Sequence, residues 1–395
     1  MFSQRTHWNR QINRLSLLLE ERSRSGLPIL NLTVSNPTEC NFPYPSNEIL
    51  ASLSHPSSMS YAPDPRGLLS ARQIVSEYYV SKKSAVVEPS SIFLTASTSE
   101  SYSFLCRLLC NGGDEILIPR PSYPLFDYLL QLNDVRAVPY HLFYDDGWYL
   151  DIDSIRKVIT ARTRAVVIIN PHNPAGMFLK ESDLRQMNDL ANDHRLALIS
   201  DEVFSEYTSG DCAAPVVKTL AANPGGALTF VLNGISKMFG LPQLKLGWIA
   251  VARSSSLDER TEAIDRLDII ADTFLSVNAP VQHALPAIFS AGKTIQSAIR
   301  LRIETNRSVL RETLEGSSCS LLRSEGGWSA ILQIPRIFSE EECAAMLLSE
   351  RGVFLYPGYF FDFPKDGFLV LSLLAEEEIF REAVGAIKNF FLSRL

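Results

Sequence analysis

Five short polar motifs in the middle of the chain follow apolar runs that predict buried strands. The first is Ser97-Thr98-Ser99, a small-residue turn that opens a predicted helix after the run Ile92–Thr95. Backbone N–H groups at a helix N-terminus, together with hydroxyl groups, suit a phosphate. The alternative is a plain helix cap with Glu100 in the first turn. This motif alone therefore leaves both interpretations open.

Two further motifs supply groups that can contact a flat ring. Tyr123 lies in a proline-flanked turn after the strand predicted at 115–118, where its ring can act as a platform. Asn173 stands between two prolines after the strand predicted at 166–169, and it can direct its amide at a ring oxygen. A turn with a packed tyrosine and an ordinary Asn-Pro turn are the alternatives.

The last two motifs carry charge. Asp201 follows the strand predicted at 196–200, where a buried carboxylate is costly unless it has a cationic partner. Lys237 follows the strand predicted at 229–232, among small and apolar residues. Partial desolvation would lower the pKa of its amine and make it nucleophilic. The alternative for Lys237 is a solvated loop lysine.

The five motifs together indicate one ligand. In open α/β sheets a ligand binds beyond the carboxyl ends of the strands, which is where all five motifs are predicted to lie. A phosphate site, a ring platform, an amide, a buried carboxylate and an activated lysine match a planar cationic heterocycle that carries a phosphate and an aldehyde. Pyridoxal 5′-phosphate is such a molecule.

Over nearly its whole length, from about Asn31, the sequence resembles the class I/II aminotransferases, which are pyridoxal-phosphate enzymes of fold type I. The blocks that carry the resemblance are 61–72 (YAPDPRGLLSAR), 113–115, 121–123, 173–176, 201–203 and 236–248. The resemblance implies a transaminase that moves an amino group from a donor to a keto acceptor by a ping-pong cycle. A lyase or decarboxylase on the same fold is the alternative, and a cofactor-binding protein without turnover is a more distant one.

The resemblance also implies roles for single residues. Lys237 matches the Schiff-base lysine, which holds the cofactor and moves a proton between the substrate α-carbon and the cofactor. Asp201 matches the aspartate that pairs with the pyridinium nitrogen, Asn173 the donor to the ring hydroxyl oxygen, and Tyr123 the stacking aromatic. The remaining cofactor-binding positions that the resemblance implies are Ser97, Thr98, Ser99, Phe204, Ser236 and Lys245.

Tyr61 matches a tyrosine that reaches the phosphate of the neighbouring subunit in this family. The resemblance therefore implies a homodimer with shared active sites.

Three departures from the family pattern concern the cofactor. Phe204 stands where a tyrosine usually donates to the ring oxygen, and this loss of a donor should raise the pKa of the Schiff base. Lys245 replaces an arginine, which keeps the charge but loses the bidentate geometry. Gly234 replaces a serine that often touches the phosphate, so fewer side chains are expected around that group.

A fourth departure concerns the substrate. Val370 stands where family members that act on α-amino acids usually carry an arginine for the substrate α-carboxylate. Either another cation replaces that arginine, or the substrate is an amine without the carboxylate. The possible replacements are Arg24, Arg66, Arg120 and Arg323. The aromatic run at 356–361 is expected either to line an apolar substrate pocket or to pack between domains.

These motifs require a sheet that brings strand ends together. Short apolar runs at 92–95, 115–118, 166–169, 196–200, 229–232 and 247–251 predict six buried parallel strands, and helical patterns such as 182–194 separate them. The sequence therefore predicts an α/β fold with a large, doubly wound, mostly parallel sheet.

A smaller α+β domain is predicted from strands at 328–334 and 368–373 and from helices at 280–315 and 376–392. The expected division is an N-terminal segment at 1–45 that packs on the small domain and the cleft, a cofactor-binding domain at 46–290 and a small domain at 291–395.

Composition excludes several classes of function. The 395 residues are 46% apolar and 21% charged, which is typical of a globular chain. A net charge of −7 argues against a nucleic-acid partner. No apolar stretch approaches the roughly 20 residues of a membrane span, and no signal peptide is expected, so we predict a cytoplasmic protein with an organelle transit peptide as the alternative. Scattered cysteines predict reduced thiols and no metal site; they are Cys40, Cys106, Cys110, Cys212, Cys319 and Cys343.

Overall fold

The computed structural model describes residues 1–395 except 211–214, 224–225, 253 and 395. Within the described residues, the largest sheet has eight strands in the order β2-β9-β8-β7-β6-β3-β4-β5. Its strands are β2 (Ile92–Thr95), β3 (Glu115–Arg120), β4 (Arg136–Tyr144), β5 (Trp148–Leu150), β6 (Thr163–Ile169), β7 (Ala197–Asp201), β8 (Thr229–Gly234) and β9 (Gly247–Val251). β3 runs parallel to β4 and β6, and β7 runs parallel to β6 and β8. The predicted α/β fold with a mostly parallel sheet is confirmed.

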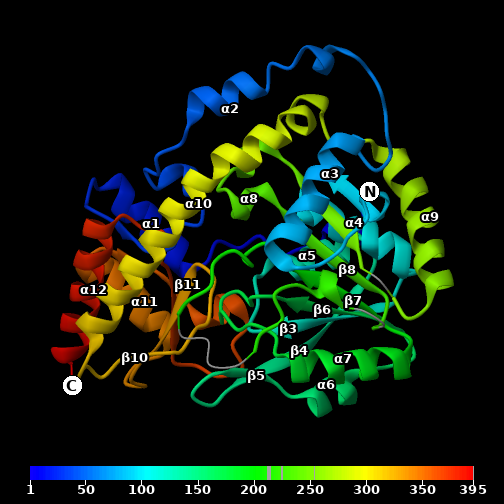
Figure 1. Ribbon diagram of the computed structural model, residues 1–395. Coiled ribbons are helices and arrows are strands. Elements are labelled where there is room, and N and C mark those ends of the chain that lie inside the picture. The colour runs from blue at the N-terminus through cyan, green and yellow to red at the C-terminus, as the bar shows by residue number, and fades with distance from the viewer. Residues whose placement is uncertain (211–214, 224–225, 253, 395) are drawn as a thin grey trace.

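Both faces of this sheet are buried, because its strands are apolar at nearly every position. Phe93 of β2 packs in one hydrophobic cluster, while its neighbours Ile92 and Leu94 pack in the other. The helices that contribute to the first cluster are α4 (Thr98–Leu109), α5 (Leu125–Leu132) and α9 (Leu257–Phe274). Those that contribute to the second include α3 (Leu69–Tyr78), α6 (Ile152–Val158) and α7 (Glu181–His194). Figure 1 shows the helices around the strands.

The prediction of six parallel strands is wrong for β9. This strand pairs antiparallel with both β8 and β2. The chain turns back after β8 through the short α8 (Ile235–Met238) and the 3-10 helix η7 (Pro242–Leu244), so that Gly247 pairs with Gly234. Such a return joins adjacent antiparallel strands, whereas a parallel pair needs a longer crossover. Strands β4 and β5 were not predicted, because exposed and buried positions alternate along β4.

A second sheet forms the smaller part of the molecule. Its strands are antiparallel, in the order β10 (Ser320–Leu321), β11 (Ser329–Gln333), β14 (Phe368–Ser372) and β13 (Tyr356–Pro357). Helices α11 (Glu340–Arg351) and α12 (Glu377–Leu392) pack against this region. The long helix α10 (Ala279–Leu314) runs from the large sheet's helices to α12, and the predicted domain boundary at 290/291 falls inside it (Figure 1).

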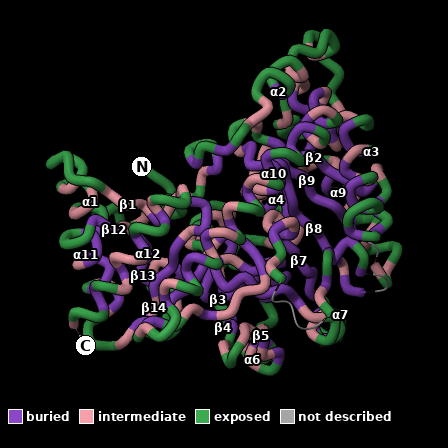
Figure 2. The backbone as a smooth tube through the Cα atoms, turned by 60° about the vertical axis from the view of Figure 1, so that its left-hand side comes forward, coloured by how far each residue is buried: buried purple, intermediate pink, exposed green. Residues whose placement is uncertain are grey.

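The N-terminal segment lies beside the small sheet and then reaches the site. Helix α1 (Arg14–Arg24) packs on α11, and β1 (Leu30–Asn31) pairs in parallel with β12 (Val353–Phe354). The following residues Thr33 and Ser35 line the pocket described below. Helix α2 (Ser46–Ser52) then packs on α10 at the exposed margin of the molecule (Figure 2).

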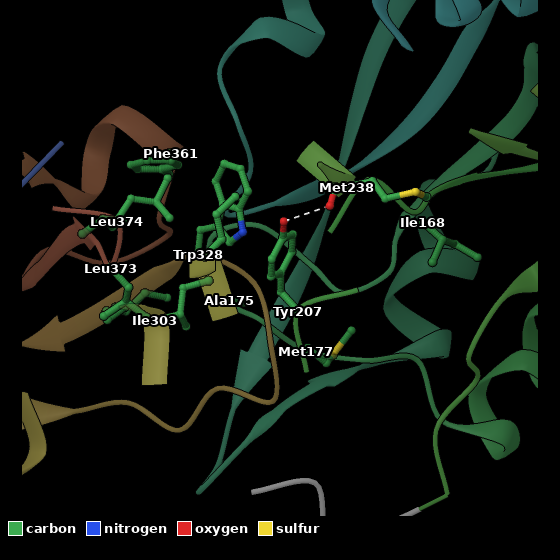
Figure 3. Packing of buried hydrophobic residues seen from close by; sticks show 14 of the residues in the cluster. Ile168, Ala175, Met177, Tyr207, Met238, Ile303, Trp328, Phe361, Leu373 and Leu374 are labelled. Carbon is green, nitrogen blue, oxygen red and sulfur yellow. Dashed lines mark hydrogen bonds between the residues drawn. The ribbon is translucent and has the colours of Figure 1, made fainter. Parts of the chain in front are cut away.

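One hydrophobic cluster extends from the large sheet to the small one. Trp328 lies between Tyr207 on one side and the side chains around Phe361 and Leu374 on the other (Figure 3). The Trp328 and Tyr207 ring centroids are 5.2 Å apart, in an edge-to-face contact. This packing connects the two sheets beside the pocket described below, which Trp328 and Phe361 also line.

Five of the six cysteines lie in the described part of the chain, and each of these five is free. Cys40, Cys106, Cys319 and Cys343 are free and buried, and Cys110 is free and half-buried. Cys212 lies outside the described residues. Among the helices that the structure describes, none is both long enough and apolar enough to span a bilayer.

Candidate active site

A pocket of about 330 Å³ lies where β6, β7 and β8 end. Residues of the large sheet's loops, of the small sheet and of the N-terminal segment line it together. Seven residues of the predicted set line this one pocket; they are Thr98, Ser99, Tyr123, Asn173, Asp201, Phe204 and Lys237. Of the described lining residues, only Asp201 and Lys237 have an acidic or a basic side chain.

Asp201 is the last residue of β7 and is 9% exposed. The Tyr102 hydroxyl donates to its Oδ2 at 3.1 Å, and the backbone N–H of Val203 donates to its Oδ1 at 3.2 Å. Burial raises the pKa of Asp201 to about 6, although these two hydrogen bonds and the nearby Lys237 oppose the shift. The carboxylate is therefore ionised at neutral pH and is suited to a cationic partner.

Lys237 lies in the four-residue helix α8, directly after β8. The single proton of the Tyr207 hydroxyl is shared between two backbone carbonyl oxygens, that of Lys237 at 2.7 Å and that of Met238 at 3.2 Å; the dashed line in Figure 3 marks the contact with Met238. The amine Nζ lies 3.5 Å from the Ser35 carbonyl oxygen and 5.2 Å from the Trp328 ring centroid. Desolvation lowers the pKa of Lys237, and Asp201 partly offsets this shift. A larger neutral fraction makes this amine a better nucleophile and base.

Asn173 and Tyr123 lie in the loops after β6 and β3. The Ser329 hydroxyl donates to Asn173 Oδ1 at 3.0 Å, which leaves the amide N–H groups to serve as donors. Three residues after Asn173, Gly176 has a φ of +69°, and a Cβ there would lie 1.9 Å from Ser324 Oγ, so the turn requires glycine. Tyr123 is 52% exposed, so its ring borders the pocket without being fully packed.

The turn at the start of α4 contains the predicted helix cap and two residues that line the pocket. Ser97 is the N-cap, because its Oγ accepts from the Glu100 N–H at 3.2 Å, and it does not line the pocket. Thr98 and Ser99 do line it, at the helix N-terminus. The expected serine at Gly234 has no room, since a Cβ there would lie 2.8 Å from the Gly247 Cα. The close approach of β9 therefore explains this departure.

Besides Ser97, three predicted cofactor-binding residues do not line the pocket: Ser236, Lys245 and Tyr61. Lys245 is exposed, with a φ of +53° at the end of η7. Tyr61 is 85% exposed and lines a separate hollow with Asp64 and His283.

Val370 lies where the resemblance places it. It is 2% exposed on β14 and lines the pocket, so an apolar side chain occupies the position expected for an arginine. None of the four candidate replacements lines the pocket in the described part of the chain. Arg24 pairs with Glu20, and Arg66 pairs with Asp268; Arg120 is 8% exposed and pairs with Asp127 and Asp362; Arg323 lines a different hollow, beside Arg307.

Several residues that support the site were not predicted from the sequence. Tyr102 lies one turn after Thr98 on α4, and this helical spacing is the signal that could have found it. Tyr207 and Trp328 carry no comparable signal, because their contacts join distant segments. Thr33 and Ser35 reach the pocket only through the pairing of β1 with β12.

The donor set fits pyridoxal 5′-phosphate. Asp201 supplies an anion for a protonated ring nitrogen, Asn173 an amide donor, Thr98 and Ser99 hydroxyls at a helix N-terminus, and Lys237 an amine of lowered pKa. These groups line the same pocket, although they come from loops far apart in the sequence.

Comparisons with known proteins agree with this chemistry. The family model described as "Aminotransferase class I and II" matches residues 28–387. The chain is 29% identical to the glutamate-pyruvate aminotransferase AlaA of Escherichia coli K12, over 92% of this chain and 91% of that protein. It is 28% identical to the alanine aminotransferase of Mycobacterium tuberculosis H37Rv, over 93% and 86% of the two chains. Among solved structures, an alanine aminotransferase from Pyrococcus furiosus has a TM-score of 0.87 at 24% identity and covers 100% of both chains.

Proposed function

The chain belongs to the class I and II aminotransferase family, and from this premise we propose that it transfers amino groups by a ping-pong cycle in a site that does not bind substrate carboxylates through a guanidinium. The family depends on pyridoxal phosphate, and the named relatives of this chain are aminotransferases, so the chain is a transaminase. The observation that carries the proposal is the pocket itself, in which Asp201 and Lys237 are the acidic and the basic side chain among the described lining residues.

Each of these residues has a part that follows from its surroundings. When bound, the cofactor supplies an electron-accepting ring that stabilises negative charge on the substrate carbon next to nitrogen. Asp201 keeps the ring nitrogen protonated, which the two hydrogen bonds to its carboxylate support. Lys237 holds the cofactor and then moves the proton at the substrate carbon, because desolvation lowers the pKa of its amine and so favours the neutral form that accepts a proton.

A ping-pong cycle requires one pocket to serve both the donor and the acceptor. The relatives named glutamate-pyruvate and alanine aminotransferases support a keto acid as acceptor. The apolar Val370 supports atypical carboxylate binding for any substrate that carries one. We also propose a homodimer, which the exposure of Tyr61 outside its own pocket supports. A cytoplasmic location stays a prediction from the sequence.

The half-reaction tests this proposal. The purified holoenzyme is incubated with an amino donor and no acceptor, and the keto product is measured. We expect about one equivalent of product per subunit, followed by return of the original visible spectrum when a keto acid is added. Lys237→Ala should abolish this turnover. Continuous release of ammonia or carbon dioxide without an acceptor would contradict transamination and would indicate the lyase or decarboxylase alternative.

A further inference from the structure

The small sheet closes one side of the pocket with uncharged side chains, and those at the centre of this wall are apolar. Val370 is 2% exposed on β14 and pairs in register with Ile331 of β11 and with Tyr356 of β13. The next residue, Leu371, also lines the pocket. A carboxylate placed against this wall would lose its hydration without gaining a cation, which is strongly unfavourable. This wall therefore disfavours substrates with a carboxylate on the reacting carbon.

Two hydroxyls of the pocket do not replace the missing cation as donors to a substrate carboxylate, because each donates its proton to another side chain. Ser329 Oγ donates to Asn173 Oδ1 at 3.0 Å, and Thr33 Oγ1 donates to Asn31 Oδ1 at 2.7 Å. Neutral hydroxyls also form weaker bonds to a carboxylate than a charged donor does. The arginine ion pairs described above keep Arg66 and Arg120 on other carboxylates.

A second, apolar hollow continues from the pocket. It has a volume of about 300 Å³ and shares Tyr123, Leu125, Tyr356 and Phe361 with the pocket. Its remaining lining residues are Pro124, Tyr128 and Phe360. None of these residues is charged, and the Tyr356 and Phe360 ring centroids lie 5.4 Å apart. A hollow lined by aromatic rings suits a flat apolar group.

From these observations, and resting on the proposed aminotransfer, we propose that the amino donor is an arylalkylamine that carries no carboxylate on the carbon bonded to nitrogen. Its nitrogen lies at the Lys237 end of the pocket, and Val370 faces the carbon position that bears a carboxylate in an amino acid. Its aromatic ring extends past Tyr356 and Phe361 into the second hollow. The apolar wall and the aromatic hollow thus select the same class of molecule.

The proposed reaction balances without a further reactant. The donor carbon loses two electrons and its nitrogen, gains oxygen from water and leaves as an aldehyde. The keto acid carbon gains two electrons and the nitrogen, and its oxygen leaves as water. Because the keto acid carries a carboxylate next to its reacting carbon, its half-reaction is expected to be the slower of the two.

A matched pair of donors tests the absence of carboxylate binding. 2-Phenylethylamine and phenylalanine share a side chain and differ only in the carboxylate. The holoenzyme is mixed with each donor in the absence of acceptor, and a single turnover is followed by absorbance. The ratio of the rate constant to the dissociation constant should be at least about tenfold higher for 2-phenylethylamine than for phenylalanine. An equal or higher value for phenylalanine would overturn the inference but leave the proposed function intact. If neither donor reacts, and no other amine or amino acid does, the proposed function fails as well.

A binding measurement tests the second hollow without turnover. Phe360 lines the hollow and not the pocket, whereas its neighbour Tyr359 lines neither. We expect Phe360→Ala to weaken the binding of 2-phenylethanol, measured by quenching of tryptophan fluorescence, by roughly fivefold to tenfold. The matched control Tyr359→Ala removes a ring from the same turn and should change binding less than about twofold. Unchanged binding in Phe360→Ala, or equal losses in both variants, would contradict the placement of the ring.

Discussion

Burial and the charge of the partner shift the pKa values of Asp201 and Lys237 in opposite directions. Desolvation raises the pKa of the carboxyl and lowers that of the amine, while the attraction between the two charges opposes both shifts. The hydrogen bonds from Val203 and Tyr102 also lower the pKa of Asp201, and the Tyr102 bond fixes one of its oxygens. The Tyr207 hydroxyl holds the backbone at Lys237. The site is therefore arranged for a ligand whose positive ring nitrogen reaches Asp201.

This arrangement predicts a pH dependence of cofactor binding. The pKa of Asp201 is raised from 3.8 to about 6, so the carboxylate is ionised above pH 6 and becomes protonated below it. A cationic ring nitrogen binds the ionised form, so affinity should fall as the pH falls through 6. Between pH 7 and pH 5 the ionised fraction drops roughly tenfold, and the cofactor affinity of the cofactor-free protein should drop by a similar factor.

The measurement is an absorbance titration of cofactor-free protein from pH 5 to pH 8. The cofactor phosphate also titrates near pH 6, so the matched control is Asp201→Asn, which retains the phosphate contribution alone. We expect this variant to bind weakly and to show a flatter profile. The same slope in both proteins would contradict the role of Asp201.

Among the helices, two glycines show how the surrounding packing determines the effect of a Gly→Ala substitution on stability. Gly292 lies within α10, and a Cβ there would be 2.5 Å from Cγ of the buried Phe239. Gly385 lies within α12, where a Cβ would meet nothing within 4 Å. The same substitution should therefore have opposite effects at the two positions.

We expect Gly292→Ala to lower the free energy of unfolding by about 1–3 kcal/mol, because Phe239 must move within a packed core. Gly385→Ala should instead raise it by about 0.5–1 kcal/mol, because alanine favours the helix. Urea denaturation of the two variants gives both values. Stabilisation by Gly292→Ala would show that the α10 contact with Phe239 is looser than the structure indicates.

The sequence could predict the bounds of several strands but not the direction of each one. Strands β2 and β9 have the predicted bounds, because runs that are apolar on both faces stop sharply at turn residues. The direction of β9 was not predictable from its composition, since it depends on the short return through α8 and η7. Motifs at strand ends correctly placed Asn173 and Asp201 in one pocket, as sheet geometry requires. Thr33 and Trp328 come from distant segments, and only tertiary pairing brings them there.

In the whole molecule, Tyr61 could contribute either to the site of its own subunit or to the site of a partner subunit. It is 85% exposed and lines a hollow apart from the cofactor pocket of its own chain. In a closed twofold dimer each subunit presents the same surface to the other, so a residue outside its own pocket can complete the partner's. The proposed homodimer therefore predicts that Tyr61 acts between subunits.

Hybrid dimers of two inactive variants test this directly. One subunit carries Lys237→Ala and the other Tyr61→Ala, with different affinity tags so that the hybrid can be purified. If Tyr61 acts across the interface, the subunit that retains Lys237 receives an intact Tyr61 from its partner, and the hybrid regains about one wild-type site per dimer. If Tyr61 acts within its own subunit, one site lacks the lysine and the other lacks the tyrosine, so the hybrid has no intact site. Activity no higher than that of the Tyr61→Ala homodimer would then contradict shared sites, whereas a monomer in sedimentation analysis would contradict the dimer itself.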